Sequence, residues 1–79
     1  MNNIEKYEHL FCECFEISRN QLKGLNYQDV AAWDSVGHMA MISAIEDAFD
    51  LMMETDDIID FSSYEKGLDI LEKKYHVQF

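Results

Sequence analysis

Apolar side chains return every three to four residues in three separate segments of this chain, and the sequence contains no proline to interrupt them. This spacing places the apolar side chains on one stripe of an α-helix. The first segment predicts a helix over residues 2–16, with glutamates on its solvent side. Its apolar stripe consists of Ile4, Tyr7, Phe11 and Phe15.

The middle segment predicts a second helix, from Ser35 to about Asp50. Asp34 is suited to cap it, because a carboxylate there can accept hydrogen bonds from free backbone N–H groups and favours the positive end of the helix dipole. The buried stripe is expected to consist of Met41, Ile42, Ile45 and Phe49. A neighbouring face, with Val36 and Met39 among acidic residues, is expected to be partly apolar and exposed.

Two more helices are predicted after residue 54. Thr55 is expected to cap a short one that is buried through Ile58, Ile59 and Phe61. Ser62 with Glu65 forms a capping-box pattern for a longer one that ends near Tyr75. The last residues, 77–79, are expected to be extended. The sequence thus predicts an all-α single domain over residues 1–79, a small four-helix bundle with three longer helices and one short helix.

A long loop separates the first and second predicted helices. Between Ile17 and Trp33 the periodicity fades, and serine, asparagine and glycine provide residues typical of turns. Apolar residues in this stretch are expected to tether it to the core; they are Leu22, Leu25, Tyr27 and Val30. Ordered loops of this length are often functional.

Charge is distributed unevenly. The formal net charge is -10, and residues 24–65 carry every excess acid and no lysine or arginine. Such a surface speeds encounter with basic partners. It argues against direct binding of nucleic acid, which needs clustered lysine and arginine.

The cysteines and the hydropathy pattern indicate a cytoplasmic protein. Cys12 and Cys14 lie on opposite flanks of the first predicted helix, so we expect them not to form a disulfide, and a reduced compartment fits. No membrane-inserted segment and no signal peptide are expected. We expect a monomer.

Three residue groups invite a catalytic or metal-binding interpretation. Asp34, Ser35 and His38 contain the residue types of a hydrolase triad, but neighbours on one exposed helix lack an oxyanion hole and a water-excluding pocket. His9 and Cys12 share a helix face, but no further ligand pair completes a metal site. The residues alone therefore predict no enzyme and no metal centre, and the simplest interpretation of Ser35 is a helix-capping serine.

The stretch Asp34-Ser35-Val36, followed by an acidic amphipathic helix and a short acid-led helix, resembles the acyl carrier proteins. In that family an Asp-Ser-Leu motif at the start of the second helix bears 4'-phosphopantetheine. The resemblance implies that Ser35 carries this group, supplied by coenzyme A, and that Asp34 is the adjacent motif residue. Gly37 departs from the family pattern, because many members carry an acidic or larger side chain there.

The resemblance also implies partners. A phosphopantetheinyl transferase would modify Ser35, and acyl-activating, acyltransferase or synthase enzymes with basic docking patches would exchange the acyl thioester. The expected partner-binding residues are Val36, Met39, Glu46, Asp47, Asp50, Glu54, Asp56 and Asp57. Fast exchange suits docking guided by charge and a small apolar centre.

Two other functions also fit these residues. An aminoacyl or peptidyl carrier uses the same prosthetic group with another cargo. An acidic helical adaptor that never carries a prosthetic group also explains the charge and the helices. The carrier interpretation covers acyl cargo for fatty acid, polyketide, or specialised lipid or glycan synthesis.

Overall fold

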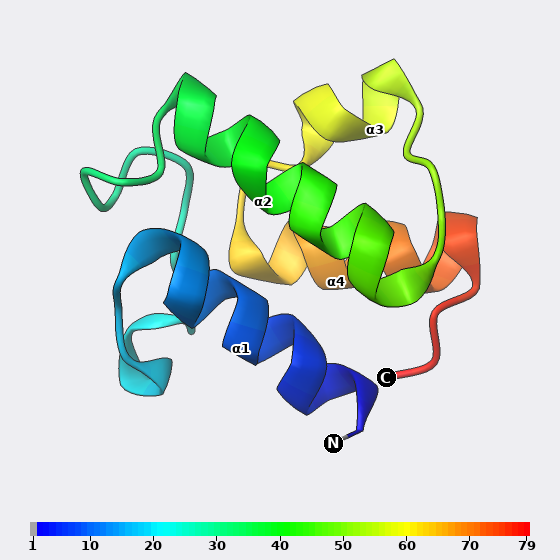
Figure 1. The fold of residues 1–79 in the computed structure, drawn as a ribbon, viewed down its shortest axis with the longest axis horizontal. Helices are drawn as coiled ribbons and strands as arrows, with labels where there is room; N and C mark the ends of the chain where they lie inside the picture. Colours follow the sequence, from blue (N-terminus) through cyan, green and yellow to red (C-terminus); the bar gives the residue numbers. More distant parts are fainter. Residues whose placement is uncertain (1) are drawn as a thin grey trace.

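The computed structural model describes residues 2–79 and shows an all-α fold built from four α-helices. They are α1 (Asn3–Phe15), α2 (Ser35–Phe49), α3 (Thr55–Asp60) and α4 (Tyr64–Tyr75), with a single 3-10 turn η1 (Arg19–Gln21) in the α1–α2 loop. Figure 1 shows α1 and α2 side by side, with α4 behind α2 and the short α3 beside the first half of α2. The predicted small helical bundle is confirmed.

The helix ends follow the capping chemistry, with two corrections. Asn2 caps α1 through a reciprocal box with Glu5, and Asp34 caps α2 as expected. Thr55 was expected to cap α3, but it is the first helical residue, and the cap position belongs to Glu54. The predicted Ser62–Glu65 box is also wrong, because Ser63 caps α4 by accepting a hydrogen bond from the backbone N–H of Lys66.

The α1–α2 loop is held by contacts with the core and with the α3–α4 connection. Leu22 and Leu25 are buried, which confirms their tethering role. Residues 25–27 run antiparallel to the α3–α4 connection: the Tyr27 N–H donates to Ser62 O at 2.9 Å and the Tyr64 N–H donates to Leu25 O at 2.9 Å. This isolated bridge was not predicted, and it holds the loop close to the end of α3.

An aromatic core fills the space between the helices. Tyr7 and Phe11 of α1 are fully buried and contact Phe61, the residue immediately after α3. Gly67 of α4 permits this packing, because a Cβ there would lie 2.2 Å from both Phe61 Cζ and Tyr7 Oη. The Tyr7 hydroxyl donates to the carbonyl of Tyr64 at 2.8 Å. Near the end of the chain, Val77 is buried. The Asn3 side chain donates a hydrogen bond to the carbonyl of Gln78, so the two ends of the described chain lie close together (Figure 1).

Among residues 2–79, no helix has the length and apolar character that crossing a bilayer requires. Cys12 and Cys14 are both free thiols, as expected from their spacing. Burial is the first cause that raises the pKa of each thiol, so neither has the lowered pKa of a reactive cysteine.

Candidate functional site

Ser35 lies at the first position of α2 and is exposed to solvent. The preceding Asp34 turns its carboxylate into the helix, where Oδ1 accepts from the backbone N–H of Gly37 at 2.8 Å. Capping is therefore done by Asp34, and within residues 2–79 the Ser35 hydroxyl makes no hydrogen bond. The Ser35 Oγ is therefore exposed to solvent and is not used to cap the helix.

Gly37 explains how the loop approaches the helix so closely. A Cβ at position 37 would lie 1.9 Å from the carbonyl oxygen of Ala32. Any larger side chain would therefore push the loop away from the first turn of α2.

Trp33 is the anchor that sets the direction of the chain before Ser35. Its side chain is fully buried, and its indole lies nearly parallel to the ring of Phe15, with 5.0 Å between ring centroids. The indole also meets Phe11 edge-on at 5.4 Å. A large aromatic group buried in this way fixes the backbone of its neighbours, so Asp34 and Ser35 start α2 from a rigid position.

His38 connects three parts of the chain around the serine. Its Nδ1 accepts from Trp33 Nε1–H at 2.9 Å, and its Nε2 lies 2.8 Å from the carbonyl oxygen of Ile58 in α3. The indole N–H can only donate and the carbonyl can only accept, so this geometry requires a neutral ring with its proton on Nε2. The two ring planes of Trp33 and His38 differ by 11°, as an in-plane hydrogen bond demands. His38 thus contacts Trp33 of the α1–α2 loop and Ile58 of α3, and neither ring nitrogen is free to act as a general base for Ser35.

An apolar pocket opens beside Ser35, between α2 and α3. Its volume is about 270 Å³. Ser35, His38 and Met39 line it from α2, and Ile58, Ile59 and Phe61 line it from α3 and the residue after it. The hydroxyl of Ser35 therefore stands at the edge of a cavity whose walls are largely apolar.

Three apolar side chains surround this edge while facing solvent. Val36 is 77% exposed, Met39 is 50% exposed and Ile59 is 71% exposed. Val36 and Met39 were expected on an exposed partner face, and their exposure agrees with that expectation. Ile59 of α3 was expected to be buried together with Ile58 and Phe61, and its exposure shows that this expectation is wrong.

The acidic residues expected on this face do not all share it. Asp34, Asp47, Asp50, Glu54 and Asp56 are exposed. Glu46 is half-buried, and its Oε2 accepts from the backbone N–H of Met53 at 2.9 Å, so it stabilises the α2–α3 connection. Asp57 is only 5% exposed. Our expectation that Asp57 belongs to the exposed docking surface is therefore wrong.

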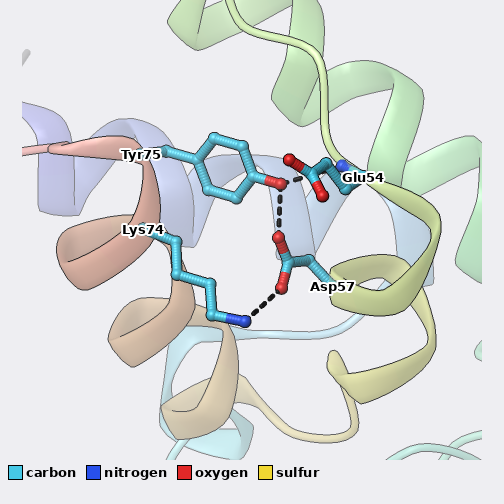
Figure 2. A network of polar contacts seen from close by, with 4 residues as sticks. All are labelled: Glu54, Asp57, Lys74 and Tyr75. Atoms are coloured by element: carbon cyan, nitrogen blue, oxygen red, sulfur yellow. Dashed lines mark hydrogen bonds and ion pairs between the residues drawn. The ribbon is translucent and has the colours of Figure 1, made fainter.

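Asp57 instead fastens α3 to α4, as Figure 2 shows. Its Oδ1 accepts from Lys74 Nζ at 2.7 Å and its Oδ2 accepts from the Tyr75 hydroxyl at 2.5 Å. The same hydroxyl accepts from the backbone N–H of Glu54 at 2.8 Å. The hydrogen bond from Lys74, followed by that from Tyr75, holds the pKa of the Asp57 carboxyl below its usual range, while the Asp57 carboxylate raises the pKa of Lys74.

No metal site accompanies these residues. Across residues 2–79 no group of three or more histidine, cysteine, aspartate or glutamate side chains lies close enough to hold a metal ion. His9 pairs instead with Glu13 on the surface of α1, at 2.9 Å.

Comparison with known proteins adds no relative: no family model, no curated protein and no solved structure matches this chain.

Proposed function

We propose that this chain is a carrier of the acyl carrier type, which holds acyl groups as thioesters on 4'-phosphopantetheine attached to Ser35. The observation that carries the proposal is the combination of a free, exposed serine hydroxyl with an apolar pocket at its side. A structural helix cap needs neither feature. Here Asp34 provides the cap.

The residues around Ser35 fit the prosthetic group. The serine hydroxyl would form a phosphodiester, and the phosphate would lie at the N-terminus of α2, where the helix dipole favours an anion. Gly37 adds no side chain next to the attachment point. When bound, the group supplies the thiol that carries the acyl cargo, a role that neither half-buried cysteine of the chain is placed to fill.

Attachment would need a partner enzyme. Ser35 Oγ would bond to the phosphorus that carries the pantetheine, while the P–O bond in the pyrophosphate of coenzyme A would break. The nucleotide half would leave with the bridging oxygen, and a base of the transferase would take the serine proton. Nothing near Ser35 in this chain serves as that base, since both ring nitrogens of His38 are occupied by Trp33 and Ile58. We therefore propose a carrier that is a substrate of a phosphopantetheinyl transferase and has no catalytic activity of its own.

The surface near Ser35 fits brief docking with enzymes that have basic patches. Val36 and Met39 form a small apolar centre, and the exposed acids Asp47, Asp50, Glu54 and Asp56 provide negative charge. Charge of this kind raises association rates without requiring a large apolar interface. The proposed partners are acyl-activating enzymes, acyltransferases and synthases, with aminoacyl or peptidyl cargo as the alternative.

Intact-protein mass spectrometry tests the proposal. The chain is incubated with coenzyme A and a broad-specificity phosphopantetheinyl transferase, beside the variants Ser35→Ala and Ser62→Ala. Ser62 is the matched control, because it lines the same pocket from the opposite side and is also exposed. We expect one phosphopantetheine on the wild type and on Ser62→Ala, and none on Ser35→Ala.

Failure has a clear meaning in this experiment. If a folded wild-type chain that is not already modified gains no mass, the carrier function is wrong and the acidic adaptor is favoured. If Ser35→Ala gains the group, the carrier function stands but its attachment site is wrong.

A further inference from the structure

The pocket beside Ser35 has one wall, formed by α3, that a single side chain of α2 contacts through a polar bond. α3 has only six residues, and helices this short are not stable by themselves, so its position depends on contacts with its neighbours. On the side facing α2, the polar contact is the bond from His38 Nε2–H to the carbonyl of Ile58. Ile58 and Ile59 of α3 form pocket walls, so this bond fixes how far the walls stand from α2.

The Ile58 carbonyl has no continuing helix to bond with. α3 ends at Asp60, two residues later, and the last carbonyls of a helix lack partners within it. His38 supplies the missing donor from another helix. The other ring nitrogen is occupied by Trp33, which is fully buried and cannot move without disturbing the core. The imidazole ring of His38 is therefore a rigid connection, or strut, between Trp33 in the core and Ile58 in α3.

We infer that His38 is the specificity-determining residue of this pocket: by holding Ile58 at a fixed distance from α2, it limits the length of the acyl chain that the pocket accepts. The inference rests on the proposed carrier function and assigns a role to a residue that carries no cargo itself. The cavity measures about 270 Å³ and has a largely apolar lining. The pocket in this state suits a short or medium alkyl chain.

Two substitutions separate the two bonds of His38. In His38→Asn the amide reaches the position of Nδ1, so it can accept from Trp33 Nε1–H but is too short to reach Ile58. In His38→Gln the amide reaches the position of Nε2, so it can donate to the Ile58 carbonyl while the bond to Trp33 is lost. The inference requires that only His38→Asn enlarges the pocket.

The first test measures how chain length stabilises the loaded protein. Ser35 is loaded from coenzyme A thioesters with unbranched chains of increasing length, and Tm is compared with that of the same variant carrying phosphopantetheine alone. A chain that enters the folded protein stabilises it, so the gain in Tm follows entry. For the wild type and His38→Gln we expect the gain to stop rising at the same chain length, where the pocket is filled. For His38→Asn we expect it to continue rising with longer chains.

A purely structural role would lower the Tm of His38→Asn equally at every chain length. Parallel curves for the wild type and His38→Asn would therefore overturn the inference, as would a wild type whose Tm does not respond to chain length. Loading itself reports on the proposed function, so its failure is seen separately, as an absent mass increase.

A second measurement tests the strut without any prosthetic group. Hydrogen exchange by NMR follows the backbone amides of Asp57 and Ile58, which both bond to the carbonyl of Glu54. In unmodified protein we expect these amides to exchange about tenfold faster in His38→Asn than in the wild type, with His38→Gln close to the wild type and amides of α4 unchanged. Equal exchange in the wild type and His38→Asn would show that His38 does not hold α3, and would overturn the inference whatever the outcome of loading.

Discussion

The short helix α3 is attached to its two neighbours by different chemistry. On the α4 side, the carboxylate of Asp57 binds Lys74 and Tyr75, and Phe61 packs against Gly67. On the α2 side, the neutral ring of His38 binds the Ile58 carbonyl across an apolar pocket. The α4 side combines charge with close packing, whereas the α2 side has one neutral bond and open space.

This difference indicates which side of α3 can give way. Opening the α2 side exposes walls that already line a cavity, whereas opening the α4 side would separate an ion pair and disturb the aromatic core. The distance between α2 and α3 therefore depends on fewer contacts than the distance between α3 and α4.

We expect the largest loss of stability from Gly67→Ala, on the α4 side of α3. The new Cβ would overlap the ring of Phe61 and the hydroxyl of Tyr7, and such overpacking costs about 3 kcal/mol. Alanine favours a helix over glycine by about 1 kcal/mol, so we expect unfolding free energy to fall by about 2 kcal/mol, measured by urea denaturation. Gly24→Ala is the control: Gly24 has a φ of 78° with open space around it, so only backbone strain of about 1 kcal/mol is expected. Equal losses would mean that the core beside α4 adapts easily.

The next test is the pH dependence of Asp57→Asn. The pKa of Asp57 is lowered in the folded protein by its bonds to Lys74 and Tyr75. Its stabilising contribution is therefore complete above the usual aspartate pKa of about 4 and is lost as the pH falls through the lower folded value. We expect Asp57→Asn to lower Tm by several degrees at pH 7, with the gap to the wild type closing below about pH 4.

Asp56→Asn is the matched control for this pH dependence. Asp56 is the adjacent acid of α3, but it is exposed, so its loss should change Tm little and should not alter the pH profile. If the Tm gap of Asp57→Asn stayed constant from pH 7 to pH 3, the charged attachment of α3 to α4 would be contradicted.

On the α2 side, His38→Phe should have a smaller effect that does not depend on salt. The phenyl ring retains the aromatic shape but leaves the buried indole N–H of Trp33 without an acceptor, at a cost of about 1.5 kcal/mol. No charge is involved, so urea denaturation in low and high salt should give the same loss. His9→Phe, on the exposed surface of α1, is the control. A loss that shrinks with salt would contradict the neutral ring.

The helices could be predicted from sequence because their signals are local. Phe11 and Met41 recur with the helical period, and Asp34 precedes an apolar run. The packing partners of α3 could not be predicted in this way. The burial of Asp57 depends on Lys74, seventeen residues away, and in sequence Asp57 looks identical to the exposed Asp56.

The same limit applies to the candidate site. Ser35 follows from its position after a capping aspartate, and its exposure agrees with the prediction. The pocket, by contrast, forms between residues of α2 and α3 that are nineteen or more positions apart. Trp33 five residues before His38 was the available signal for the strut, because an indole next to a helix start needs a hydrogen-bond acceptor when buried.

The smallest effects compare two adjacent lysines of α4. Lys74 crosses to the buried Asp57, whereas Lys73 pairs with Asp69 of its own helix at 2.9 Å, with both side chains exposed. Each change to methionine removes one positive charge from a chain of net charge -10, so long-range repulsion rises equally. We expect Lys74→Met to lower Tm at low salt, with part of the loss recovered in high salt because Lys74 is half-exposed. The Tm of Lys73→Met should fall only by the amount that the added repulsion causes, because exposed ion pairs within one helix contribute little. Equal losses would mean that α3 gains nothing from its ion pair with α4, and that burial of Asp57 depends on the Tyr75 hydroxyl alone.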